Sequence, residues 1–203
     1  MENCFVLRHA VVSDAAEIHV LLQEAFREYA EFLGVTQLEA LNESIKDVEY
    51  EIKNNTVFVA IADGCIIGTI RVRISGDEAY ISRLAVSKPH RNMGVGESLI
   101  NLVDRFLQSK GVKKAILYTA SNNPNLVRFY YGRGFYIDSV SHERGYPRAR
   151  MIKEYRNIDT DEELCVNIKQ TLSFANKVVP LQINSFQKNR VKCHGIRCKD
   201  TIQ

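Results

Sequence analysis

Apolar residues follow two different spacings along the first 155 residues of the chain. In residues 14–29 and 36–53 they recur every three or four positions, which predicts two amphipathic helices. Elsewhere they form short runs separated by turn sequences that contain glycine and aspartate, and such runs predict antiparallel strands. The strands expected in this part of the chain cover residues 4–8, 57–62, 66–74 and 78–86.

The next segment, residues 95–120, shows the helical spacing first and then an apolar run typical of a strand. Residues 95–109 keep their apolar side chains on one face of a predicted helix, which Gly111 ends, and residues 114–120 predict a buried strand. A strand, a helix and a strand in this order form a parallel pair with a right-handed crossover. Two more strands are expected at residues 135–140 and 148–155, so the chain predicts a mixed sheet flanked by helices.

The strand that ends at residue 86 runs directly into a basic turn that contains two glycines. Gly94 and Gly96 permit positive φ angles and a close approach of an anion to the backbone, while Lys88 and Arg91 add positive charge. The helix that follows leaves about four N–H groups unpaired at its positively polarised start. This combination predicts a site for a phosphate group.

The spacing within the turn excludes two common nucleotide-binding motifs. A dinucleotide-binding fingerprint needs a glycine where Leu99 stands. A Walker loop needs Gly-Lys-Ser/Thr, whereas Gly96 is followed by Glu97 and Ser98. The pattern that does fit is R-x-x-G-x-G, over residues 91–96.

A second motif lies downstream, after the predicted strand at residues 114–120. Asn123 precedes Tyr130 by seven residues, and the pair Gly134-Phe135 follows that tyrosine by four and five residues. The two motifs, in this order and at this separation, resemble those of the GNAT family, the Gcn5-related N-acetyltransferases.

The resemblance implies an α/β fold with an α+β mixed sheet, of the GNAT-like acyl-CoA N-acyltransferase type. The central sheet is then mostly antiparallel, with one splayed parallel strand pair, and helices flank it. The implied co-substrate is acetyl-CoA, whose acetyl group passes directly to a primary amine of a small molecule or peptide. The cofactor-binding residues implied are Leu84, Ala85, Val86, Arg91, Asn92, Met93, Gly94, Val95, Gly96 and Asn123.

Two of the motif residues have alternative explanations. Tyr130 matches the family residue that protonates the departing thiolate, and a phenol can act as such a general acid. Tyr130 is also the middle one of three adjacent aromatic residues and can simply pack among them. Asn123 matches a residue that binds the coenzyme arm, but Asn before Pro124 is also a good helix cap.

The general base is less clearly marked in the sequence. The position that carries a glutamate in histone-acetylating relatives is Tyr80 here. Glu78 lies two residues earlier on the same face of the predicted strand, and it is our candidate for the catalytic base. The alternative is that Glu78 is a solvated residue beside a turn.

Acceptor recognition is expected near the first helix and in the loop of residues 141–147. Glu24, Glu28 and Tyr29 belong to a net acidic stretch that suits a cationic amine, although charged residues on a helix are also common on a solvated face. In the loop, His142, Glu143 and Tyr146 either line the same mouth or occupy an ordinary exposed turn.

Composition and charge restrict the class of protein. At 203 residues and 45% hydrophobic content, the chain is long enough to bury a core. It has no apolar stretch of about 20 residues and no signal-peptide pattern, so we expect a cytoplasmic protein without a membrane partner. The five cysteines are an odd number, which favours reduced thiols.

Residues 156–203 are expected to form a C-terminal extension to a catalytic domain at residues 1–155. The extension begins with an amphipathic pattern that predicts a helix, packed on the domain or on a second subunit in a homodimer. It holds 8 Lys and Arg against 5 Asp and Glu, whereas the first 155 residues hold 19 of each. Its Cys193, His194 and Cys198 fall short of the four ligands of a structural zinc site, so no metal is expected.

Three functions therefore remain open at the level of sequence. The paired motifs favour an N-acetyltransferase with Tyr130 as general acid. The weakly marked base leaves the alternative of a non-catalytic acyl-CoA-binding sensor or regulatory module. A nucleic-acid-binding or partner-binding module is disfavoured, since only the basic tail indicates it.

Overall fold

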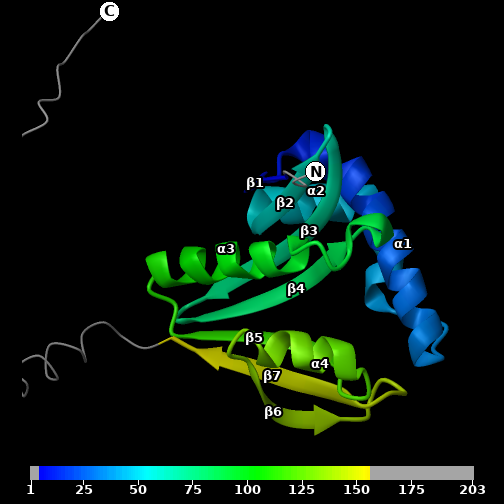
Figure 1. Cartoon of the computed structure of the whole chain (residues 1–203), viewed down its shortest axis with the longest axis vertical. Helices are drawn as coiled ribbons and strands as arrows, with labels where there is room; N and C mark the ends of the chain where they lie inside the picture. The colour runs from blue at the N-terminus through cyan, green and yellow to red at the C-terminus, as the bar shows by residue number, and fades with distance from the viewer. Residues whose placement is uncertain (1–4, 156–203) are drawn as a thin grey trace, which may run out of the picture. The chain divides into compact units, whose positions relative to one another are not determined.

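The computed structural model describes residues 5–155, which form a seven-stranded sheet with helices on both faces (Figure 1). The strands are β1 (Val6–His9), β2 (Thr56–Ala62), β3 (Cys65–Ser75), β4 (Glu78–Val86), β5 (Lys114–Ala120), β6 (Tyr136–Ser141) and β7 (Arg148–Glu154). The α-helices are α1 (Ala15–Leu33), α2 (Ile45–Asn54), α3 (Val95–Ser109) and α4 (Pro124–Tyr131). Short 3-10 helices are η1 (Val12–Asp14), η2 (Glu39–Asn42) and η3 (Lys88–His90). The helix and basic tail predicted in residues 156–203 lie outside the described residues.

The sheet has the strand order β1-β2-β3-β4-β5-β7-β6, and its neighbours are antiparallel except for β4 and β5. This parallel pair is joined only at its beginning, where Glu78 to Tyr80 of β4 face Lys114 to Ile116 of β5. Beyond Tyr80 the two strands diverge, as their ribbons in Figure 1 show. The prediction of a mixed sheet with one splayed parallel pair is thus confirmed.

Two apolar cores hold the helices against opposite faces of the sheet. One core contains α3 residues such as Leu99 and Val103 together with Tyr130 of α4. The other contains Ile18 and Leu22 of α1 and Val48 of α2. Strand β4 contributes to both cores, through Ala79 and Ile81 to the first and Ala85 to the second, and so lies between the two helical layers.

The expected helix over residues 36–53 is wrong in its first half. The structure has η2 there, an extended residue at Glu43, and then α2 from Ile45. Ser44 begins α2 with a capping box, in which its backbone N–H donates to Asp47 Oδ2 at 2.8 Å and its hydroxyl accepts from Asp47 N at 3.3 Å. The capping pair stops the helix from extending backwards, although the apolar spacing continues across it.

A β-bulge at Arg83 shapes the splayed part of β4. The register with β3 shifts between Thr69 and Arg71, where one extra residue of β4 is accommodated. Arg83 adopts a left-handed backbone with φ 53°, which is uncommon outside glycine. The bulge bends β4 where it leaves its neighbour β5.

Candidate active site

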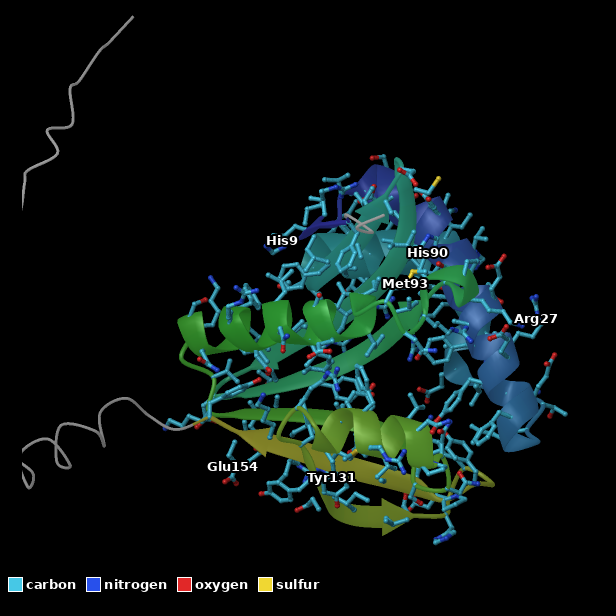
Figure 2. The ribbon with its side chains drawn as sticks, viewed as in Figure 1. His9, Arg27, His90, Met93, Tyr131 and Glu154 are labelled. Atoms are coloured by element: carbon cyan, nitrogen blue, oxygen red, sulfur yellow. The ribbon has the colours of Figure 1, made fainter. Side chains whose placement is uncertain are left out.

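The predicted phosphate-binding turn connects β4 to α3. Gly94 is the N-cap of α3 with φ 79°, and Asn92 also has a positive φ of 61°. No side chain caps this helix, and the first regular bond of its amides runs from Ser98 N to Gly94 O at 2.9 Å. The backbone N–H groups of Val95, Gly96 and Glu97 thus remain available to an anion. Met93 and His90, labelled in Figure 2, lie on the same turn.

The two basic side chains of the turn are engaged by α1. Arg91 Nη1 lies 2.7 Å from Glu28 Oε2, and Lys88 Nζ lies 3.3 Å from Glu28 Oε1. The hydrogen bonds from Arg91 and then Lys88 lower the pKa of Glu28. Glu28 is thus paired with two cations of the turn, and its expected part in acceptor recognition stays a prediction. A cavity of about 260 Å³ separates this part of α1 from the turn.

Gly96 lies where the start of α3 approaches both β4 and α4. A methyl group at Gly96 would lie 3.5 Å from the ring of Phe129 and 3.6 Å from Val86 Cγ2. These are ordinary van der Waals distances, so the protein itself tolerates a side chain there. Packing within the described residues therefore does not explain the glycine at this position.

Tyr130 is buried where α4 meets the sheet. Its ring makes edge contacts with Phe129 and Phe135 at centroid distances of 5.1 and 5.9 Å. Burial strongly raises the pKa of Tyr130, the nearby Tyr29 raises it further, and Arg133 lowers it. The phenol therefore stays protonated over the whole working pH range, so it can donate a hydrogen bond but not act as a base. Both the packing and the general-acid explanations remain compatible with this position.

Tyr29 of α1 lies near Tyr130, a position that the sequence did not predict. Its hydroxyl oxygen accepts a hydrogen bond from Ala120 N at 2.8 Å, across 91 residues of sequence. Burial raises the pKa of Tyr29, whereas the bond from Ala120 lowers it. The hydroxyl of Tyr29 therefore ties the C-terminal part of α1 to the end of β5. The only sequence signal for this contact with β5 was the position of Tyr29, four residues before the end of α1.

Arg133 was also missed, although it lies in the second motif. Its guanidinium stacks 3.7 Å from the centroid of the Phe129 ring and pairs with Glu97 of the first turn of α3 at 3.1 Å. Arg133 thus ties the end of α4 to the start of α3. Its place beside Gly134 in the motif was the available signal.

Asn123 caps α4, as its residue type and Pro124 predicted. Its Oδ1 accepts a hydrogen bond from Leu126 N at 3.2 Å, and Pro124 is the first helical residue. The capping explanation is therefore confirmed. Its predicted bond to the coenzyme arm stays a prediction.

Glu78 lies at the joined beginning of the β4–β5 pair, opposite Lys114. The Lys114 Nζ donates to Glu78 Oε1 at 2.8 Å, and this bond raises the pKa of Lys114. Glu78 thus has an ion-pair partner on the neighbouring strand. Its role as the base stays a prediction.

A cluster of ion pairs covers the α2 side of β3 and β4. Glu43 Oε1 and Oε2 accept hydrogen bonds from Arg71 Nη1 and Nη2, both at 3.0 Å, and Oε1 also accepts from Arg83 Nη2 at 2.7 Å. Burial alone would raise the pKa of Glu43, but the bonds from Arg71 and Arg83 hold it below its usual value. The sequence signal for this cluster was Arg71 and Arg73 at alternate positions of an otherwise apolar strand.

Tyr80 lies beside this cluster, at the last position of β4 that pairs with β5. Its ring contacts that of Tyr118 at 5.9 Å, and the Arg148 guanidinium lies 4.1 Å from the centroid of the Tyr118 ring. In the loop between β6 and β7, Arg144 pairs with Glu39 at 2.6 Å and so attaches the loop to η2. These contacts gather aromatic and cationic groups at the side of the splay away from α3.

Comparison with known proteins agrees with this geometry. A family model described as the acetyltransferase (GNAT) family matches residues 17–135, which include both motifs in full. The chain belongs to the GNAT acetyltransferase family. This GNAT chain is 32% identical over 94 residues to the uncharacterized protein YyaT of Bacillus subtilis, a match that covers 45% of the chain and 62% of YyaT.

A second relative of this GNAT chain is the spermidine N(1)-acetyltransferase of Thermoplasma acidophilum, 28% identical over 81 residues, 40% of the chain and 50% of the relative. The chain thus spans about half the length of these relatives. Among solved structures, the PaiA N-acetyltransferase of Thermoplasma acidophilum in complex with coenzyme A has a TM-score of 0.66 at 21% identity. That match covers 75% of this chain and 99% of the other, and it confirms the GNAT fold.

Within residues 5–155, no group of three or more His, Cys, Asp and Glu side chains is arranged to hold a metal ion. None of the helices in this part of the chain is long and apolar enough to cross a membrane. The Cys193, His194 and Cys198 group lies outside the described residues.

Proposed function

We propose that this GNAT chain is an acetyl-CoA-dependent N-acetyltransferase that acts on a primary amine of a small molecule or peptide. Residues 1–155 form its catalytic domain in this proposal, and residues 156–203 are an extension. The observation that carries the proposal is the uncapped start of α3, which the turn connects to the end of β4 that diverges from β5. A phosphate-bearing thioester fits this combination of free amides and opened strands.

The residues of this site suit coenzyme A in particular. The amides of Val95, Gly96 and Glu97 suit the pyrophosphate, and the glycine at position 96 leaves space next to Val86 and Phe129 for the arm. A relative named for the acetylation of spermidine and a structural neighbour solved with coenzyme A support the same assignment. Phosphate binding at the turn would compete with Glu28 for Arg91 and Lys88, whose pairs are exposed and therefore weak.

In the reaction, the amine nitrogen bonds to the acetyl carbon, the carbon–sulfur bond breaks, the amine loses a proton and the sulfur gains one. We assign proton donation to Tyr130, whose raised pKa keeps its hydroxyl protonated. Sharing that proton with a developing thiolate is typically worth about 10²- to 10⁴-fold in rate. Glu78 is proposed to receive the amine proton, directly or through water.

Calorimetric titration of the full chain with acetyl-CoA, with NADH as the control ligand, tests the proposal first. Thiol release is then measured in the same preparation across a panel of primary amines. We expect the chain to bind acetyl-CoA but not NADH, and to release thiol with one class of amine. Binding without release on any amine would support the alternative, a non-catalytic acyl-CoA sensor. Failure to bind acetyl-CoA would overturn the proposal.

A further inference from the structure

Helix α1 contacts both strands of the splayed pair. Beyond Tyr80, β4 no longer pairs with β5. Ala85, in this diverging part of β4, is buried in the same apolar core as Ile18 of α1. Further along the same helix, the hydroxyl of Tyr29 binds the backbone N–H of Ala120 at the end of β5. Helix α1 therefore connects the two strands across the opening between them.

The bond of Tyr29 lies on the edge of β5 that faces β4. Successive residues of a strand direct their N–H groups to opposite edges. The N–H of Ser121 donates to Pro147 O at 2.9 Å, on the β7 side of the strand. The N–H of Ala120 therefore points away from β7 and into the opening, where it donates to the Tyr29 hydroxyl at 2.8 Å. The end of the Tyr29 side chain thus lies where a backbone carbonyl of β4 would stand in a closed sheet.

Tyr130 approaches the opening from the opposite face of the sheet. It belongs to the core that contains α3, whereas Tyr29 comes from α1 on the other face. The two phenols are close enough for Tyr29 to raise the pKa of Tyr130. In the proposed reaction the coenzyme sulfur lies at Tyr130, and the acyl carbon is bonded directly to that sulfur. The acyl group would then lie between the two tyrosines.

We propose that Tyr29 limits the length of the acyl group that the site accepts, so that α1 makes the site selective for an acetyl thioester over longer ones. The inference rests on the proposed acetyl-CoA-dependent function. The bond to Ala120 holds the phenol in the opening, and the packing on Ala85 holds the helix. A longer acyl chain would have to displace the phenol, which would leave the N–H of Ala120 without its acceptor.

Calorimetric titration of the full chain with acetyl-CoA, butyryl-CoA and coenzyme A tests the inference. Coenzyme A has no acyl group, so it reports on the rest of the site. We expect the wild type to bind acetyl-CoA about tenfold or more tightly than butyryl-CoA, because the added methylenes lack room. Tyr29→Phe keeps the ring but loses the bond, so this preference should fall by about threefold or more, with an unchanged affinity for coenzyme A. Tyr50→Phe, at an exposed position of α2, is the matched control and should keep the wild-type preference.

Three results would overturn the inference while the proposed function stands. The wild type could bind acetyl-CoA and butyryl-CoA equally, or Tyr29→Phe could keep the full preference. Loss of coenzyme A binding in Tyr29→Phe would mean that Tyr29 supports the whole site and not the acyl group in particular. A wild-type chain that binds none of the three ligands would instead refute the proposed function. Because the titrations need no acceptor amine, they decide the inference even if the chain is a non-catalytic sensor.

Discussion

The hydroxyl of Tyr130 is the polar atom on which the proposed chemistry depends most. Its ring is held between Phe129 and Phe135, and its pKa is raised mainly by burial. A phenol with a raised pKa is a poor source of a free proton but a permanent hydrogen-bond donor. It suits a step in which a thiolate develops and shares a proton with it.

Tyr130→Phe should lower kcat by at least about tenfold, because the phenylalanine keeps the packing but loses the donor. Affinity for acetyl-CoA should change little, which steady-state kinetics and calorimetry would show. Tyr131→Phe is the control, since Tyr131 is 49% exposed and should behave like the wild type. Turnover of Tyr130→Phe near the wild-type rate would leave Tyr130 only its packing role.

Glu78→Gln tests the proposed base. A glutamine cannot accept the amine proton, so we expect a lower kcat and the loss of the acidic limb of the pH–rate profile. Asp77→Asn serves as the control, because Asp77 is a neighbouring exposed acid that pairs with Lys113 at 3.6 Å. If the pH–rate profile of Glu78→Gln is unchanged, Glu78 is not the base and only forms the ion pair with Lys114.

At the scale of elements, the position of α3 on the sheet depends on Gly68 of β3. A methyl group built there would lie 2.9 Å from Val95 Cγ1 and 3.1 Å from Leu99 Cδ1, both buried atoms at the start of α3. This close approach brings the first turn of α3 down onto β3, beside the end of β4. The same contact therefore sets where the free amides of the turn lie.

Gly68→Ala should destabilise the fold by about 1–3 kcal/mol, because the core at this point has no room for the added methyl group. Urea unfolding measures the loss. Gly132→Ala is a matched control, since Gly132 has an ordinary helical φ of −61° and a methyl group there would approach no atom closer than 3.4 Å. A loss in Gly68→Ala as small as in the control would mean that α3 moves freely away from β3.

At the scale of the whole molecule, Glu43 connects three parts of the chain that are distant in sequence. Its side chain binds Arg71 of β3 and Arg83 of the β4 bulge, while its carbonyl oxygen lies 3.0 Å from His19 Nε2 of α1. The connection between α1 and α2 is thereby held against the strands that border the splay.

Glu43→Gln should cost about 3 kcal/mol at pH 7, since it leaves two enclosed arginines short of a counter-charge. The pKa of Glu43 is lowered in the folded chain, so its contribution is present above the unfolded value of about 4.5 and is lost as the pH falls below it. Urea unfolding at neutral and acidic pH should show the two proteins converging in acid. Glu49→Gln, which removes an exposed pair with Lys53 at 3.9 Å, should cost less than about 0.5 kcal/mol at any pH. A difference that does not shrink in acid would contradict this account.

The elements were largely predictable because their signals are local. The helix at residues 95–109 and the strand at residues 114–120 have the predicted bounds, since apolar spacing and Gly111 act over a few residues. The segment at residues 36–53 failed because the capping box at Ser44 and Asp47 competes with the apolar spacing, and only the capping geometry decides between them. The spacing along β4 indicated Glu78 as the candidate base. Its ion pair with Lys114 depends on the neighbouring strand β5 and could not be read from that spacing.

By itself, the sequence determined the order of elements, the phosphate-binding turn and the GNAT motifs, because each element and each motif is encoded in one short stretch of the chain. The tertiary structure alone decided that Glu28 takes the cations of the turn, that Tyr29 reaches Ala120, and that Glu43 joins Arg71 to Arg83. These contacts join residues 28 to 91 positions apart, and no periodicity along the chain encodes such pairs. They form only when the helices pack on the sheet and the bulged strand separates from its neighbour.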